Sequence, residues 1–175
     1  MSQNVDVATV PAESLIFESQ PRSHYLESYR VILPKGCRTD LSGATRSILF
    51  DQSPAWIDTL MSWRNRFAKL VGLKVTEVDK QEVLDNFSLD RESLGIFKIY
   101  ATNDFEVILG DDDWHLDFRV SIRLNDREQQ EVVLTTAVNY KNWFGRIYFF
   151  PVSFIHRLMV AFLLRNARWR QAVAK

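Results

Sequence analysis

Hydrophobic and polar residues alternate through the middle of the chain, which is the pattern of strands with one buried face. The clearest case runs from Trp114 to Leu124, where every second residue is large and apolar and the intervening residues are polar. Similar alternation, bounded by turn residues, predicts further strands over 25–33, 97–101, 105–109 and 132–140. Four of these five strands are separated only by short turns, so we expect an antiparallel sheet with one apolar and one polar face.

Helical spacing of apolar residues appears between the first strand and the others. Asp40 precedes apolar positions that predict a short helix over 41–49. Ser53 is a good N-cap, Pro54 suits the first helical position and Gly72 suits the end, so a second helix is expected over 53–72. Its apolar stripe consists of Trp56, Leu60, Trp63, Phe67 and Leu70. The acidic stretch 74–95 then reads as a long, partly ordered connection that is either a lid or a flexible segment.

The end of the chain is apolar and predicts a long helix. A turn is expected over 140–145, a short strand over 146–150 and a helix that begins at Pro151. One side of this helix is predicted to face the sheet through Ile155, Leu158, Met159, Phe162, Leu163 and Trp169. Val160 and Leu164 are predicted on the far side, which would need a second neighbour such as a loop, a ligand or a partner subunit in a homodimer.

The order of these elements is a strand, two helices, an antiparallel meander and a long C-terminal helix. This order predicts an α+β fold of the START-like helix-grip type, in which the sheet wraps around the last helix. We expect residues 1–20 to form an irregular N-terminal arm and residues 21–175 to form a single domain, because 175 residues suffice for one well-buried core.

Charge is distributed unevenly along the chain. The formal net charge is zero, but Glu131 is the last acidic residue and the following 44 residues contain only basic charges. A neutral chain has no global field that favours nucleic acid, so no nucleic-acid partner is expected. Cys37 is the single cysteine and no secretion signal is visible, which makes the cytoplasm the expected location. Arg157 and Pro151 interrupt the apolar stretch 147–164, so no transmembrane segment is predicted.

Three polar residues on the best strand form the first candidate site. His115, Asp117 and Arg119 are expected to share one face of the strand, where they would hold an anionic group or form cross-strand pairs on the surface. One imidazole and one carboxylate are an incomplete ligand set, so we expect no metal site. The neighbouring stretch 110–113 is predicted to be a charged hairpin turn, since it lacks the ligand spacing of a calcium loop.

A second candidate site lies at the start of the last helix. Arg146, Tyr148 and His156 would either orient a polar ligand head at a cavity mouth or cap the helix and pair across the surface. Motifs for phosphate binding, nucleophilic catalysis and zinc proteolysis are absent from the sequence, and no cofactor is expected.

Two stretches also resemble a known family. They are Gly110 to Arg119, and Asn142 to Tyr148 continuing through Pro151 to Phe154, His156 and Arg157, and both are similar to the bacterial domain of unknown function 2867 family. The resemblance implies a START-like, SRPBCC-type fold. It implies no activity, because the family is uncharacterised, and the short-chain dehydrogenase-like domain of some relatives has no counterpart in this chain.

Three functional hypotheses follow. The first is a non-catalytic module that binds a hydrophobic small molecule or lipid between sheet and helix; its ligand-binding residues would be Arg119, Arg146, Tyr148, His156, Phe118 and Phe162. The second is an enzyme of the polyketide-cyclase or dehydratase type, whose acid and base would come from His115, Asp117, Tyr148 and His156. The third is an interaction or membrane-surface module that uses the basic, aromatic C-terminal helix.

Overall fold

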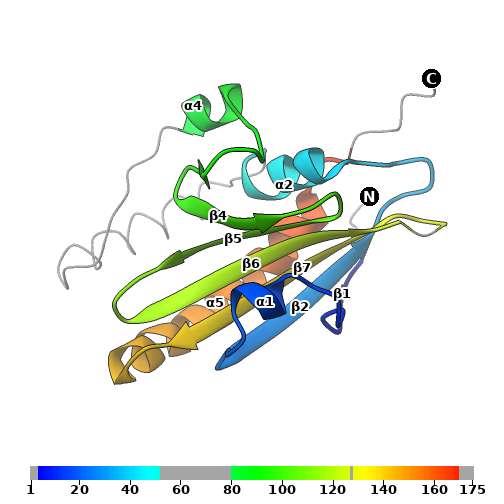
Figure 1. The fold of residues 1–175 in the computed structure, drawn as a ribbon. Helices are drawn as coiled ribbons and strands as arrows, with labels where there is room; N and C mark the ends of the chain where they lie inside the picture. The colour runs from blue at the N-terminus through cyan, green and yellow to red at the C-terminus, as the bar shows by residue number, and fades with distance from the viewer. Residues whose placement is uncertain (1–3, 52–79, 127, 170–175) are drawn as a thin grey trace.

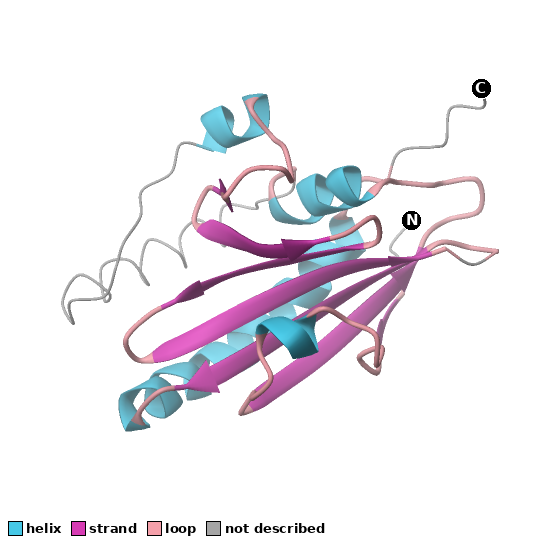
Figure 2. Cartoon of the chain, viewed as in Figure 1, coloured by secondary structure: helices cyan, strands magenta, loops and turns pink. Residues whose placement is uncertain are grey.

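The chain folds into an antiparallel sheet with a long helix on one face (Figures 1 and 2). The structure is a computed structural model, and it describes residues 4–51, 80–126 and 128–169. The strands in this part are β1 Val5–Val7, β2 Tyr25–Ile32, β3 Ser93–Leu94, β4 Phe97–Thr102, β5 Glu106–Asp112, β6 Leu116–Asn125 and β7 Glu131–Tyr140. The helices are α1 Ile16–Ser19, α2 Leu41–Leu49, α4 Lys80–Asp85 and α5 Trp143–Asn166.

The strand order is β1-β2-β7-β6-β5-β4-β3, and every neighbouring pair is antiparallel. The last strand of the sequence, β7, therefore lies at the centre, between β2 and β6. Its first eight residues are all buried, on both faces. This differs from the expectation of one apolar and one polar face, because protein covers both sides of the central strands.

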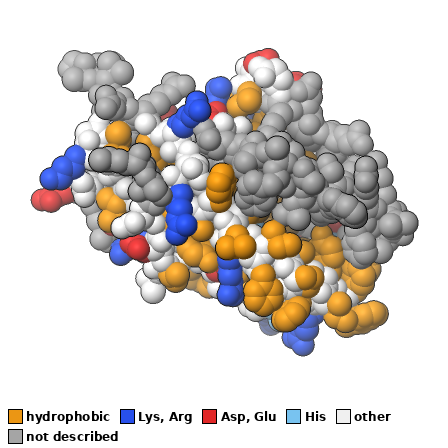
Figure 3. Space-filling model, turned by 180° about the vertical axis from the view of Figure 1, so that it is seen from behind, with side chains coloured by type: hydrophobic (Ala, Val, Ile, Leu, Met, Phe, Trp, Pro, Cys, Tyr) orange, Lys and Arg blue, Asp and Glu red, His pale blue; other side chains and the backbone are white. Residues whose placement is uncertain are grey.

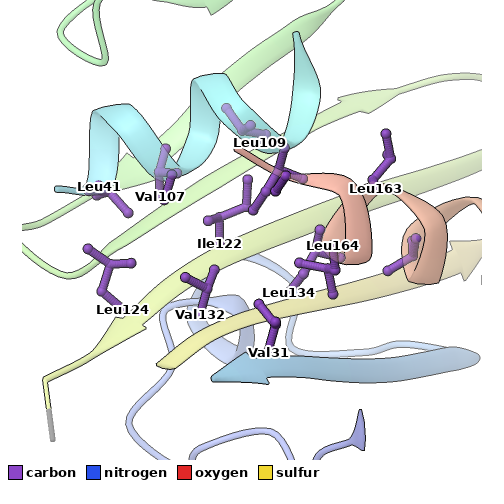
Figure 4. Packing of buried hydrophobic residues seen from close by; sticks show 14 of the residues in the cluster. Val31, Leu41, Val107, Leu109, Ile122, Leu124, Val132, Leu134, Leu163 and Leu164 are labelled. Carbon is purple, nitrogen blue, oxygen red and sulfur yellow. The ribbon is translucent and has the colours of Figure 1, made fainter. Parts of the chain in front are cut away.

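One face of the sheet carries the main core. Helices α5 and α2 both pack on this face, and Figure 4 shows their buried side chains against those of the strands. The cluster includes Val31, Leu109, Ile122, Leu134 and Leu164, each at most 3% exposed. A hydrogen bond from the Ser47 hydroxyl to the Arg168 carbonyl (3.0 Å) fixes α2 beside the end of α5.

The opposite face is covered by α1 and the segment before it (Figure 1). Ile16 packs there against Ile108 and Ala137, and all three side chains are buried. Next to them lies Glu106, which has no exposed surface.

Four protein groups donate hydrogen bonds to the Glu106 carboxylate. One oxygen, Oε1, accepts hydrogen bonds from the hydroxyls of Ser14 and Ser121, both at 2.5 Å. The other oxygen, Oε2, accepts from the Leu15 backbone N–H at 3.1 Å and from Arg123 Nη1 at 3.0 Å. The N-terminal segment is thus joined to the sheet by a buried charge, since burial is tolerated only when a charge is paired and hydrogen-bonded.

The predicted fold class is confirmed, and so are the main strands. The sheet with its long C-terminal helix is consistent with the helix-grip arrangement. Helix α2 has the predicted bounds, and Asp40 caps it by accepting a hydrogen bond from the Gly43 N–H at 2.7 Å. The predicted helix over 53–72 lies outside the described residues.

The start of the last helix was predicted wrongly. Helix α5 begins at Trp143 and not at Pro151, because the Asn142 side chain accepts a hydrogen bond from the Gly145 N–H (3.0 Å) and acts as the N-cap. The expected strand over 146–150 is therefore helical, and Pro151 lies inside the helix. Gly145 is required there, because a Cβ at this position would collide with the carbonyl oxygen of His115.

The buried side of α5 was predicted only in part. Leu163 is buried and Met159 and Phe162 pack against the main core as expected, but other positions differ. Val160 and Leu164, expected on the far side, are 3% and 0% exposed, whereas Leu158, expected against the sheet, is 71% exposed. The physical reason is α2, which packs beside the C-terminal half of α5 and covers a side of it that the sheet alone would leave open.

Smaller differences concern the loops. The expected irregular arm contains β1, which pairs with β2, and α1, whose Ile16 is buried. The division into an arm and a domain stays a prediction. The expected turn over 110–113 is strand as far as Asp112. Of the connection 74–95, residues 74–79 lie outside the described part, and the rest contains α4 and β3.

Candidate functional site

The predicted site residues lie in separate places. Asp117 and Arg119 are on the face of the sheet away from α5, whereas His115 precedes β6 and packs against α5. Contrary to the prediction, His115 therefore does not share a face of the sheet with Asp117 and Arg119. Its ring centroid lies 5.1 Å from that of Tyr148 and 5.7 Å from that of Phe144, and its side chain is 4% exposed.

A ladder of charged and aromatic contacts surrounds Asp117 and Arg119. Arg119 is 6% exposed; its Nη1 lies 2.8 Å from Asp112 Oδ1, and its Cζ lies 3.5 Å from the centroid of the Tyr100 ring. The Tyr100 hydroxyl donates to Asp112 Oδ2 at 2.9 Å, and Lys141 Nζ lies 2.6 Å from Asp117 Oδ1. These contacts pair the charged groups with one another, so the ladder joins neighbouring strands.

The pKa values of two carboxyl groups in this ladder are shifted in opposite directions. Asp112 and Asp117 are directly opposite each other on β5 and β6. Burial and the neighbouring Asp112 raise the pKa of Asp117, although Lys141 opposes them. Burial also raises the pKa of Asp112, but Arg119 and Tyr100 outweigh it and hold the pKa below its usual value.

His156 takes part in a second polar cluster, between α5 and β2. Its Nδ1 lies 2.6 Å from Oε1 of Glu27, whose side chain is 9% exposed. The other oxygen, Oε2, accepts from the hydroxyls of Tyr25 (2.5 Å) and Tyr29 (3.4 Å) and lies 3.4 Å from Arg157 Nε. Arg157 also donates to the Tyr25 hydroxyl at 3.2 Å. Protein groups satisfy both oxygens, so the cluster fixes helix to sheet.

The same contacts shift pKa values in the cluster, including those of Glu27 and Tyr25. Burial raises the pKa of Glu27, but hydrogen bonds from His156 and Tyr25 and the charge of Arg157 outweigh burial, and the net pKa is lowered. Burial and the hydrogen bond to Glu27 raise the pKa of Tyr25 to about 12. The pair is therefore held as carboxylate and phenol near neutral pH.

Replacing Glu27 with glutamine is expected to remove stability that exists at neutral pH and disappears in acid. Because the folded-state pKa lies below the ordinary value of 4.5, the contribution is complete above pH 4.5 and is lost as the pH falls through the lowered value. Hydrogen bonds to a charged group contribute about 1.5–3 kcal/mol. Urea unfolding of both proteins from pH 3 to 7 measures their free energies of unfolding, and the two values should converge in acid. The exposed control Glu18→Gln should follow the wild type, and a constant gap between Glu27→Gln and wild type would contradict this role.

The remaining predicted ligand-binding residues are spread over α5 and β6. Arg146 is exposed, Tyr148 is half-buried against His115, and Phe162 packs on the main core. Phe118 belongs to the cluster of Leu116 and lies edge-on to Phe97, with centroids 6.2 Å apart. Arg146, Tyr148 and His156 thus do not converge on one ligand head. Their binding role, like the catalytic role of the four acid–base candidates, stays a prediction.

Two surface hollows in the described part are open to solvent. One, of about 860 Å³, lies between the turn 34–38 and residues 128–131; the other, of about 780 Å³, lies between the N-terminal segment and the β6–β7 turn. None of the predicted site residues lines either hollow. No grouping of three or more His, Cys, Asp or Glu side chains suited to a metal occurs among the described residues.

The most distinctive surface feature is an exposed apolar stripe on α5. Its five large side chains, at i, i+4, i+7, i+11 and i+15, are between 56% and 74% exposed. They are Trp143, Ile147, Phe150, Phe154 and Leu158. A rise of about 1.5 Å per residue gives the stripe a length of roughly 22 Å. Figure 3, which views the α5 side, shows hydrophobic side chains gathered over this region with basic side chains beside them.

The stripe points away from the sheet. Its members lie on the side of α5 opposite Phe149 and Leu163, which are 4% and 9% exposed. In the part of the chain that the structure describes, α5 is the one helix long and apolar enough to cross a membrane by length and composition. Only 22% of an apolar 18-residue stretch of this helix is buried. Exposed apolar patches of this kind are typical of surfaces that contact a protein partner, a ligand or a membrane.

Comparison with protein families places the chain. Residues 19–162 match the family described as protein of unknown function (DUF2867). The chain belongs to this family. No curated protein and no solved structure matches it.

The DUF2867 match covers some of the features above and not others. It extends from the end of α1 to Phe162, so it contains the Glu27 cluster, the ladder around Arg119 and the whole apolar stripe. Ser14, which binds Glu106, lies before it. The match thus supports the predicted family, and the START-like placement stays a prediction.

Sequence reasoning missed Glu27 and Glu106, the two most buried carboxylates of these networks. Glu27 does carry a signal, since it alternates with Tyr25 and Tyr29 on the predicted apolar face of the first strand. A carboxylate at such a position requires a partner from whatever covers the face. Glu106 carries a weaker signal, because its partner Ser14 comes from a segment without a periodic pattern.

Proposed function

We propose that the chain is a non-catalytic lipid-binding module that contacts lipid through the apolar stripe of α5. The observation that carries the proposal is the continuous exposure of five large apolar side chains on a helix whose other side packs against the sheet. Burying such a side chain completely contributes about 1.5–3 kcal/mol, so even partial insertion of five of them yields appreciable affinity.

The shape of the surface favours lipid over a small ligand. The stripe is a ridge on a convex helix and lacks the walls that enclose a drug-sized molecule. Between the sheet and the helices, buried side chains such as Ile48, Leu134 and Leu164 occupy the space where an internal ligand would lie. A fluid acyl phase adapts to a ridge, and aromatic side chains such as Trp143 suit the boundary between headgroups and acyl chains.

The enzyme hypothesis receives less support. Acid–base catalysis needs its groups within reach of one substrate. Asp117 is paired with Lys141 on one face of the sheet, while His156 is paired with Glu27 on the other. His115 and Tyr148 do meet, but in ring contact within an aromatic cluster and not beside a described hollow.

Removing two rings from the stripe is expected to abolish most lipid binding. For the double variant Phe150→Ser/Phe154→Ser we expect a loss of roughly 100-fold in partitioning, because each ring contributes at least about 1.5 kcal/mol when inserted. Flotation with vesicles of mixed phosphatidylcholine and phosphatidylserine measures this loss.

The matched control is Phe105→Ser, since Phe105 is also more than half exposed but lies beside β5. It should bind vesicles like the wild type. Equal losses in the control and the stripe variant, or no binding by the wild type, would contradict the proposal. Circular dichroism would verify that each variant folds.

A further inference from the structure

Basic side chains accompany the apolar stripe. Helix α5 contains Arg146, Arg157 and Arg165 and no acidic residue. All three arginines are exposed. At about 100° per residue, Arg146 and Arg157 lie along one flank of the stripe, and Arg165 lies in line with it beyond Leu158. The exposed side of the helix is therefore apolar along its length and purely cationic in its charge.

One of these cations is already oriented. Arg157 is held by Glu27 and by the Tyr25 hydroxyl, yet its side chain remains 54% exposed beside the stripe. These two contacts orient the guanidinium at the surface of the protein, next to the stripe. Arg146 and Arg165 extend the same cationic surface toward the two ends of the helix.

The net charge of the whole chain affects how this cationic surface would attract an anionic partner. Because the formal net charge is zero, an anionic surface is attracted by local cations and not by the molecule as a whole. A helix with an aromatic and aliphatic face and flanking arginines has the composition of helices that lie in the interface of anionic bilayers.

We infer that α5 lies flat on an anionic membrane surface, with its apolar stripe among the acyl chains and Arg146, Arg157 and Arg165 at the phosphate level. This inference rests on the proposed function and names the lipid class and the geometry. A second copy of the chain would match the apolar stripe but not its charge, since two such helices would bring like charges together.

Contacts on the inner side of α5 argue against a spanning helix, although its length would permit one. Leaving the sheet would expose the buried side chains of Val160 and Leu164 and break the pairing of His156 with Glu27. A span would also place Arg157 among the acyl chains, where a charged side chain is costly. The flat orientation keeps all of these contacts.

The first test compares two double variants that each remove two positive charges and therefore have the same net charge. Arg146→Gln/Arg165→Gln should weaken binding to vesicles containing phosphatidylserine by about 25-fold, at about 5-fold for each arginine. The control Lys35→Gln/Arg91→Gln removes the same charge from exposed loop positions outside α5 and should bind like the wild type. Raising the salt concentration to about 0.5 M should remove most of the difference.

The second test measures depth. In a Cys37→Ser background, single substitutions Trp143→Cys, Phe150→Cys and Leu158→Cys carry an environment-sensitive label, and quenchers at known depths locate it. A flat helix gives three similar, shallow depths. A middle label much deeper than the end labels indicates a spanning helix and overturns the inference.

The outcomes separate this inference from the proposed function. Binding that needs the stripe but is equal for phosphatidylcholine and phosphatidylserine overturns the anionic surface and leaves the lipid module standing. A failure to bind either vesicle overturns both. A dimer in sedimentation equilibrium that Phe150→Ser/Phe154→Ser dissociates, without vesicle binding, also overturns both and assigns the stripe to a second copy.

Discussion

Replacing Glu106 with alanine is expected to lower the free energy of unfolding by about 3–5 kcal/mol, because it breaks a buried ion pair on one side only. The Arg123 guanidinium, 14% exposed, would lose its inner partner. The hydroxyls of Ser14 and Ser121 and the Leu15 N–H would lose their acceptor at the same time. Urea unfolding followed by circular dichroism measures the change.

Two further variants make this prediction specific. Glu13 binds the same Arg123 from the surface, where its side chain is 69% exposed, so Glu13→Ala should cost less than about 1 kcal/mol. A loss of 3–5 kcal/mol is a large part of the stability of an ordinary domain, about 5–15 kcal/mol. Should Glu106→Ala not fold, Glu106→Gln retains the shape and part of the hydrogen bonding and should give a smaller, measurable loss. Equal effects of Glu13→Ala and Glu106→Ala would contradict the importance of burial.

Replacing Leu164 with alanine is expected to destabilise the fold by about 2–5 kcal/mol, since its side chain is fully buried in the main core and truncation leaves a cavity. The matched variant Leu158→Ala removes the same atoms from the same helix at a position that is 71% exposed, and it should change stability by no more than about 0.5 kcal/mol. Thermal and urea unfolding of the two proteins decide between them. A larger loss for Leu158→Ala would restore the orientation of α5 that the sequence pattern favoured.

The contrast between Leu158 and Leu164 shows why the sequence predicted the strands better than the last helix. A strand has two faces, so the alternation through Val107 and Leu109 is enough to identify the face that packs in the main core. Helix α5 is apolar around most of its circumference, and periodicity alone cannot select the side that packs. That side depends on α2, whose position beside the end of α5 is a tertiary contact without a local signal.

The candidate site divides in the same way. The basic, apolar character of the C-terminal helix was evident from the sequence, because composition and charge need no coordinates. The pairing of His156 with Glu27 was not, since 129 residues separate them. Such pairs arise from strand order, and no spacing rule connects them.

The position of β7 has a consequence for how the chain folds. Among the described strands it is the last to be synthesised, and it joins the β1–β2 pair to β6, with Tyr25 paired to Val138 across more than 100 residues. Until β7 is in place, β2 and β6 each present an unpaired edge, and the two halves of the sheet have no strand pairing between them. Because closing such long loops precedes any gain from pairing, we expect slow folding on a time scale of milliseconds to seconds. A nascent chain that pauses before Glu131 would therefore expose two unpaired strand edges that can pair with other chains. The risk of aggregation is greatest in the interval before β7 is synthesised.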